Sequence, residues 1–307
     1  MKYVYASIRK LMERSSAPVR HLWAPALLVA LFLVARPASL FAQALGWEGE
    51  TGVFVTPTAY TIPSPERKFA LPVASYHYLD GGSVLGKFSQ MSVTSGYAKR
   101  IEFGYTRDFH STGSDPALSS LWTDGFNTFH GKGVIIKENS WKKPWMPELS
   151  TGFMARTQVH NVGGAITHKD THNEDVYLVG SKMITQLKPM PVLISGGVRG
   201  TNAELWGLGG NTPDFTARAF GSVAFVFQGP AKSTVILAME VAQQPRHPSQ
   251  LPAATIRTTM VYAARVLPSP KLPLNLDVGV LEGPGVIAPG TDLKAKCRPA
   301  FALSYAF

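Results

Sequence analysis

The chain ends on residues 300–307, which read AFALSYAF. Large apolar side chains alternate here with small ones, and the apolar side carries Phe301, Leu303, Tyr305 and Phe307. A repeat of two residues is the period of a β-strand. The ends of a soluble chain usually fray, whereas a closed membrane barrel pairs its last strand with its first. We therefore expect a β-barrel that spans an outer membrane, with these four residues as the assembly signal for the barrel-assembly machinery.

The N-terminus has the pattern of an export signal. A basic lead precedes an apolar run of fourteen residues, Leu22 to Ala35, and Ala42-Gln43-Ala44 follows as a small-x-small site. The run is shorter than the roughly 20 residues that a membrane-spanning helix needs, and Pro25 interrupts it. We expect a signal peptide over residues 1–44, cleaved after Ala44. A retained membrane anchor is the alternative.

The net charge argues against nucleic acid as a partner. The whole chain carries 30 Lys+Arg and 20 Asp+Glu, a formal charge of +10. Residues 1–44 hold six of these basic residues and one acidic residue, so cleavage leaves 24 against 19, a charge of +5. The mature chain shows no basic stripe with interleaved aromatic residues. Cys297 is the only cysteine, which excludes an internal disulfide.

After Ala44 the apolar residues fall mostly at a spacing of two, which indicates strands rather than helices. Twelve strand-like segments span residues 68–79, 90–98, 101–109, 128–137, 148–159, 175–187, 192–201, 217–228, 232–242, 255–266, 272–282 and 298–307. In most of them an apolar face opposes a polar or charged one, as lipid outside and water inside require. Segments 175–187 and 192–201 alternate poorly.

The connections between these segments alternate in length. Long ones, rich in Gly, Ser, Thr, Pro, Asp and Asn, span residues 80–89, 110–127, 160–174, 202–216, 243–254 and 283–297. Long external loops and short periplasmic turns are typical of bacterial outer-membrane barrels. Tryptophans at the strand ends and connections match a membrane-interface girdle; they are Trp122, Trp141, Trp145 and Trp206.

These patterns together predict an all-β fold, an antiparallel transmembrane β-barrel of about twelve strands over residues 68–307. The barrel is expected in the outer membrane, surrounded by outer-membrane lipid. A soluble β-sandwich, whose strands also alternate, is the competing fold.

Residues 45–67 stand apart as a short periplasmic lead or plug-like segment. Within them, residues 49–59 read GETGVFVTPTA. This stretch resembles the G-x-x-G-L-x-x-x-P-T-A pattern of YjbH-type outer-membrane proteins, which are linked to exopolysaccharide production and export, with Val53 in place of leucine. The match covers about eleven residues of the 307. The resemblance implies an outer-membrane barrel with envelope polysaccharide components as partners.

Two clusters of chemistry-bearing residues lie in expected external loops. His247 and Ser249 are residue types of an outer-membrane lipase, but prolines interrupt their loop, and a nucleophile needs a base held by rigid neighbours. His168 and His172 flank an acidic stretch, but this spacing brings two histidines together only on a helix. We therefore expect no catalytic residue, no metal site and no cofactor.

The lumen is the remaining functional surface. Nine polar side chains are predicted to line it: Glu102, Arg156, Gln158, Arg218, Glu240, Arg257, Arg265, Asn275 and Asp277. Either these charges border a narrow water-filled path that favours anions, or they pair across the interior and plug it. We expect a non-enzymatic barrel, a narrow channel or anchor for small or saccharide-like solutes. The alternatives are a structural partner in envelope polysaccharide export and an outer-membrane lipase.

Overall fold

The structure is a computed structural model that describes residues 44–115, 122, 125–159, 171–187, 190–203, 212, 214–245, 256–269 and 271–307. All described residues belong to one compact unit of the chain. The expected signal peptide, apart from Ala44, lies outside the described residues. Within the described residues, no helix is long and apolar enough to cross a membrane.

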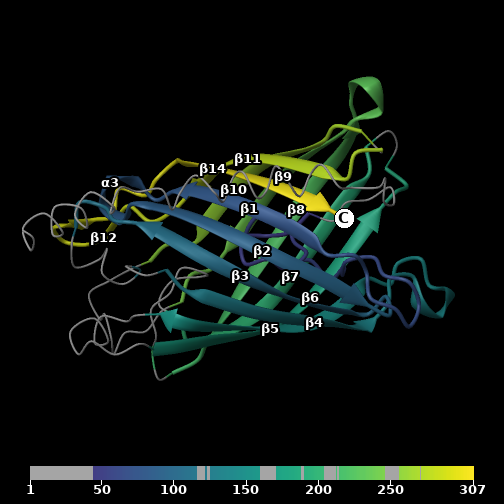
Figure 1. Cartoon of the computed structure of the whole chain (residues 1–307), viewed down its shortest axis with the longest axis horizontal. Helices are drawn as coiled ribbons and strands as arrows, with labels where there is room; N and C mark the ends of the chain where they lie inside the picture. The colour runs from purple at the N-terminus through teal and green to yellow at the C-terminus, as the bar shows by residue number, and fades with distance from the viewer. Residues whose placement is uncertain are drawn as a thin grey trace, which may run out of the picture. The chain divides into compact units, whose positions relative to one another are not determined.

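Twelve antiparallel strands close into a barrel (Figure 1). They are β1 Val73–Asp80, β2 Lys87–Tyr97, β3 Ile101–Ser111, β4 Asn127–Ile136, β5 Glu148–Val159, β6 Thr171–Ile184, β7 Val192–Thr201, β8 Thr216–Gln228, β9 Thr234–Ala242, β10 Thr259–Leu267, β11 Leu274–Glu282 and β14 Arg298–Ala306. Each strand pairs with the next barrel strand along the chain, and β14 pairs with β1, where Ala306 lies opposite Val73. The predicted twelve-stranded antiparallel barrel is confirmed.

Short elements occupy two of the connections. The one-turn helix α3, Gly82–Leu85, joins β1 to β2, and this connection is shorter than the residues 80–89 expected from the sequence. The small sheet of β12, Val286–Ala288, and β13, Thr291–Asp292, lies between β11 and β14. We call the end of the barrel that holds these two connections the loop end. The other is the turn end, where Ala98 and Lys99 take left-handed φ values of 53° and 59° between β2 and β3, as tight hairpin turns require.

The outer face of the barrel is an apolar belt. On β3, Ile101, Phe103 and Phe109 are exposed large hydrophobic residues, and on β11 Leu276 and Val278 are. Other strands contribute Val93, Phe129, Phe153, Val176, Leu178, Ile194, Val198, Leu237, Met239, Tyr262 and Phe301. Soluble proteins rarely expose contiguous apolar surface on this scale, whereas a lipid-facing barrel wall requires it.

The inner face is buried and mixed in character. On β6, Asn173, Asp175, Tyr177 and Val179 are buried, and Val176 between them is exposed. The burial of β6 therefore alternates although its sequence alternates poorly. The inner face accepts apolar as well as charged residues because protein, not water, fills the space beside it.

The tryptophans do not share one environment. Trp141 and Trp145, in the β4–β5 turn, are exposed, as an interface girdle requires. Trp122 is 2% exposed, and its ring lies edge-on to Phe88 at 5.3 Å. The placement of Trp122 in an interface girdle is therefore wrong, because this residue packs into the core at the loop end. Trp206 lies outside the described residues.

Candidate functional site

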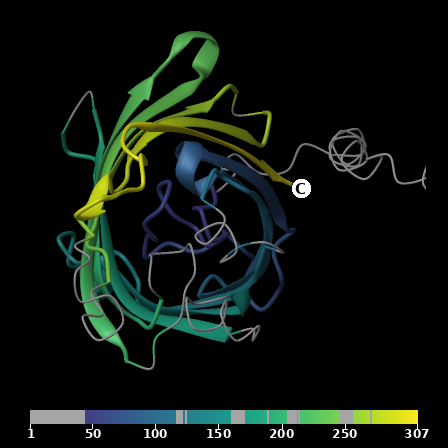
Figure 2. The same cartoon turned by 90° about the vertical axis from the view of Figure 1, so that its left-hand side faces the viewer.

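Residues 45–62, here called the plug, lie inside the barrel (Figure 2, the purple segment within the ring). Every residue from 44 to 59 is buried. Two isolated bridges, Leu45 with Thr51 and Gly52 with Pro57, fold the segment onto itself. Many other backbone groups of the plug bond to side chains of the wall, which takes the place of water as their partner.

Glu240 on β9 holds the middle of the plug. Its carboxylate accepts hydrogen bonds from the backbone N–H groups of Phe54 (2.8 Å), Val55 (3.0 Å) and Thr56 (2.6 Å), and from the Thr56 hydroxyl (2.6 Å). Successive N–H groups that converge on one carboxylate form an anion nest. Glu240 is 1% exposed, and a buried carboxylate needs partners. The seated plug supplies them.

A second anchor is the ion pair of Glu102 on β3 and Lys132 on β4, whose charged atoms lie 3.1 Å apart. Glu102 accepts hydrogen bonds from the backbone N–H of Thr51 (2.8 Å) and of Ile62 (3.0 Å). Lys132 donates to the carbonyl oxygens of Thr51 (3.0 Å) and Thr58 (3.1 Å). The pair therefore satisfies both donors and acceptors of the plug backbone.

The third anchor is a buried network of four charges. The plug residue Glu48 bonds to Arg156 on β5 (Nε–Oε1, 2.7 Å) and to Arg199 on β7 (Nη1–Oε2, 3.0 Å). Asp175 on β6 bonds to the same two arginines at 2.6 and 3.0 Å. All four side chains are at most 1% exposed. Two positive and two negative charges balance, which a buried ionic cluster requires.

The fourth anchor is Arg265 on β10. Its guanidinium bonds to Asp277 on β11 through two contacts of 2.8 Å. The same group donates to the carbonyl oxygens of Gly52 (3.3 Å) and Val53 in the plug. Arg265 therefore binds a carboxylate of the wall and two carbonyls of the plug, and it does not border an open channel.

The Thr-Pro-Thr-Ala segment of the plug, residues 56–59, touches several parts of the wall. Its partners are Glu240 for Thr56, Ser195 for Pro57, Lys132 for Thr58, and both Ser150 and Ser181 for Ala59. Residues 56–59 therefore hold the plug against the wall through their own hydrogen bonds.

Glu50, also in the plug, is buried, and neither of its carboxylate oxygens has a hydrogen-bond partner within the described residues. Burial raises the pKa of Glu50 to about 8, with a further rise from Glu48 and opposing effects from Arg199 and Lys132. Glu50 is therefore largely protonated at neutral pH and adds no full negative charge to the plug.

Most side chains that were predicted to line the lumen lie on the inner face of the barrel. They are Glu102, Arg156, Arg218, Glu240, Arg265, Asn275 and Asp277. Arg218 is half-buried and lies opposite Arg199 in the register of β7 and β8. Glu102, Glu240 and Arg265 bond to the plug backbone. Arg156 bonds to Glu48, and Asp277 bonds to Arg265. Asn275 is buried.

Two predicted lumen residues lie elsewhere. Gln158 is exposed, and its side chain accepts hydrogen bonds from Arg107 and Asn127 (both 2.8 Å). An irregularity in the β5–β6 pairing between Arg156 and Val159, with φ of 62° at Gln158, breaks the alternation there. Arg257 is exposed because it precedes β10, which begins only at Thr259.

The four residues of the expected assembly signal differ in environment. Phe301 is exposed on the outer face and Leu303 is half-buried. Tyr305 is 6% exposed, with its ring 5.2 Å from that of Phe307. The backbone N–H of Phe307 donates to the carbonyl of Pro72 (3.1 Å), so the last residue is tied to the segment just before β1.

Sequence reasoning missed Glu48, Lys132, Asp175 and Arg199. Asp175 and Arg199 belong to the two segments whose poor alternation gave no face assignment. Lys132 stands between two glycines, and its even spacing from Thr128 along β4 is the signal that could have identified its inward face. Glu48 was assigned to the lead without a partner in the wall.

Of the four chemistry-bearing loop residues, the structure describes one. His247, Ser249 and His168 lie outside the described residues, and His172 is exposed on β6 rather than in a loop. Across the described part of the chain, no group of three or more His, Cys, Asp and Glu side chains is placed to hold a metal ion.

No protein-family model and no curated protein matches the sequence. Among solved structures, the chain is similar to the NanC porin, with 9% identity and a TM-score of 0.42 over 78% of this chain and 99% of that one. It is also similar to the beta domain of the Bordetella autotransporter BrkA, with 12% identity and a TM-score of 0.38 over 78% of this chain and 100% of that one. The function must be inferred from the chain's own residues.

Proposed function

We propose that this chain is a non-enzymatic outer-membrane β-barrel that forms a narrow channel for small solutes, closed by its own N-terminal segment in this structure. The apolar belt around the closed barrel supports a place in a lipid bilayer. The expected signal peptide and the final strand support export and insertion by the barrel-assembly machinery. Long loops outside and short turns in the periplasm complete the proposed orientation.

The observation that carries the proposal is the plug and its anchors. A barrel of this strand number leaves room inside. Residues 45–62 occupy this room, and side chains on several strands hold them there. These contacts favour the second of the two sequence-based interpretations, in which the lumen charges pair and close the interior. Buried charges of the wall hold the plug backbone by hydrogen bonds, and the rings of the plug also pack in the core, so loss of a charged partner should weaken the seat of the plug.

Planar-bilayer recording tests the proposal. The wild-type chain is expected to show rare, small openings, and Glu48→Gln to show more frequent ones, because the substitution leaves Arg156 and Arg199 with Asp175 alone. Glu66→Gln is the matched control, since Glu66 is 81% exposed and pairs only on the surface with Lys99. If neither the wild type nor the Glu48 variant conducts at any voltage, the channel hypothesis is refuted and the anchor hypothesis is kept. Steady wild-type conductance equal to that of the variant would show that the plug does not close the lumen.

The saccharide specificity and the polysaccharide-export role have weaker support. Both come from the resemblance over residues 49–59, and the contacts of residues 56–59 are with this chain's own wall. We therefore favour the channel over the structural partner. Unchanged surface polysaccharide after deletion of the gene would count against the latter.

A further inference from the structure

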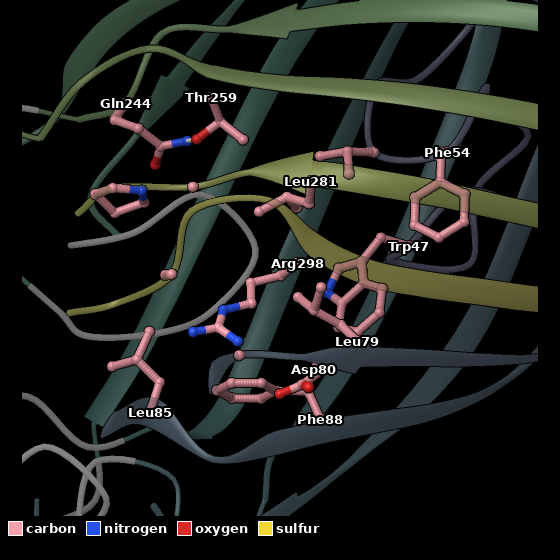
Figure 3. Close-up of a pocket in the computed structure, with 15 residues that line it drawn as sticks. Trp47, Phe54, Leu79, Asp80, Leu85, Phe88, Gln244, Thr259, Leu281 and Arg298 are labelled. Carbon is pink, nitrogen blue, oxygen red and sulfur yellow. Dashed lines mark hydrogen bonds between the residues drawn. The ribbon is translucent and has the colours of Figure 1, made fainter. Parts of the chain in front are cut away.

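A cavity of about 60 Å³ lies between the plug and the wall at the loop end of the barrel (Figure 3). The plug contributes the rings of Trp47 and Phe54, and the wall contributes Leu79, Phe88 and Leu281. In Figure 3 these side chains gather around one space from both sides. The cavity thus belongs jointly to the plug and to strands β1, β2 and β11.

The size and lining of this cavity suit an organic group better than water. A cavity needs about 10–15 Å³ to hold one water molecule, so this cavity has room for a larger occupant. Apolar walls offer water few hydrogen bonds, and such cavities take up apolar molecules instead. The rings of Trp47, Phe54 and Phe88 favour an aromatic body, which packs against them in edge-on or offset geometry.

Among the polar residues of the lining, Gln244 and Thr259 bond to each other (2.7 Å). Two other donors, on Trp47 and Arg298, favour an oxygen-bearing head group. The indole N–H of Trp47 is buried, the residue being 3% exposed, and has no acceptor within the described residues. A buried donor without a partner is unfavourable. A ligand oxygen that reaches this N–H gains a hydrogen bond, and the N–H has no water to lose because it is already buried.

Arg298 supplies the charge. Its guanidinium lies on the lining of the cavity, and its Nε and Nη2 atoms donate to the carbonyl of Lys294 (Nε–O, 2.8 Å). These contacts use two of the five N–H groups of a guanidinium and hold its plane in one place. Asp80, the acidic residue of the lining, accepts a hydrogen bond from the backbone N–H of Gly82 (2.8 Å).

We propose that this cavity binds a small aryl carboxylate, with the ring among Trp47, Phe54 and Phe88 and the carboxylate between the Trp47 indole N–H and Arg298. The inference deepens the proposed function, because it names a class of solute that contacts the plug. Binding itself can be measured on the purified full chain without any conductance.

The binding test uses benzoate as the probe and the full chain in a non-ionic detergent, with ligand-observed NMR titration as the readout. Benzoate should bind saturably. The uncharged isostere benzamide should bind about tenfold more weakly, since it lacks the charge-assisted contact to Arg298, and acetate, which lacks the ring, should not bind measurably.

Two variants and two controls locate the site. Arg298→Gln should weaken benzoate about tenfold and leave benzamide unchanged, and Trp47→Phe should weaken both ligands. Arg67→Gln and Trp145→Phe, both at exposed positions, should bind like the wild type. The folded barrel is verified for each variant by its heat-dependent shift on a denaturing gel.

The absence of saturable benzoate binding would overturn the inference, and so would binding that neither Arg298→Gln nor Trp47→Phe weakens. Failure here is distinguishable from failure of the channel. Binding with the predicted variant pattern in a chain that never conducts would uphold the site and refute the channel. Conductance in Glu48→Gln without benzoate binding would uphold the channel and refute the binding site.

Discussion

Glu240→Gln should release the plug while the barrel stays closed around it. The wild-type carboxylate accepts hydrogen bonds from three successive backbone N–H groups, those of Phe54, Val55 and Thr56. A glutamine keeps one acceptor oxygen and places an NH₂ group beside these N–H donors. At least one hydrogen bond is therefore lost, and the remaining ones have a neutral acceptor in place of a charged one. Hydrogen bonds to a charged group contribute about 1.5–3 kcal/mol each. A net loss of about 3 kcal/mol raises the population of the released plug roughly a hundredfold.

Thiol labelling measures that population. Cys297 is exposed and is first replaced by serine, and Thr58→Cys then places one thiol at a plug position that is 3% exposed. Maleimide labels this thiol only when the plug leaves its seat, so the labelling rate reports release. The rate in Glu240→Gln should rise by about two orders of magnitude over the parent.

Two comparisons make the result decisive. Glu66→Gln makes the same chemical change at an exposed position and should leave the labelling rate of Thr58→Cys unaltered. Circular dichroism should show equal strand content in all variants. A Glu240→Gln protein with an intact barrel and a labelling rate within about threefold of the parent would refute the view that Glu240 holds the plug.

Three other perturbations address the plug and the last strand. Gly49→Ala should accelerate labelling of Thr58→Cys, because Gly49 has a φ of +92° and an added Cβ would lie 2.3 Å from the Thr106 hydroxyl oxygen; a rate equal to the parent's would contradict this. Since the pKa of Glu50 is raised from 4.5 to about 8, the folded chain keeps a proton that the unfolded chain releases between these values. Stability should therefore fall as pH rises through this window, by at most about 1.4 kcal/mol per pH unit. Thermal unfolding at pH 5 and pH 8 checks this, and Glu50→Gln should remove the contribution. Phe307→Ala should slow insertion into lipid vesicles, followed by the heat-dependent gel shift, because the Phe307 ring packs on Tyr305 at the seam; an unchanged insertion rate would argue against an assembly signal.

The barrel could be predicted from the sequence because its wall obeys one local rule. Residues 272–282 alternate between apolar and polar side chains, and β11, Leu274–Glu282, exposes Leu276 and Val278 while it buries Asp277. A period of two is readable in any strand that has lipid on one side and polar partners on the other. The terminal stretch AFALSYAF has the same property, and β14 closes the ring.

The plug could not be predicted in the same way because its contacts are not local. Glu48 and Arg199 are 151 residues apart in the chain, and Phe54 and Glu240 are 186 residues apart. No periodicity connects such pairs. The plug also explains why segments 175–187 and 192–201 alternate poorly, since inward residues such as Tyr177 and Val179 pack against protein and need not be polar.

The geometry of the anchors bears on how the plug opens. Glu240, the Glu102–Lys132 pair, the Glu48 network and Arg265 contact the plug from different strands, and each is a charge with little or no exposure to water. Loss of one anchor leaves a buried charge without its partner, which is strongly unfavourable until water enters. Water enters only when the plug has moved away from the other anchors as well. Release should therefore be concerted, with a seated and a released plug and few states between. Single-channel openings of one amplitude, rather than a graded series, are the expected signature of such a two-state element.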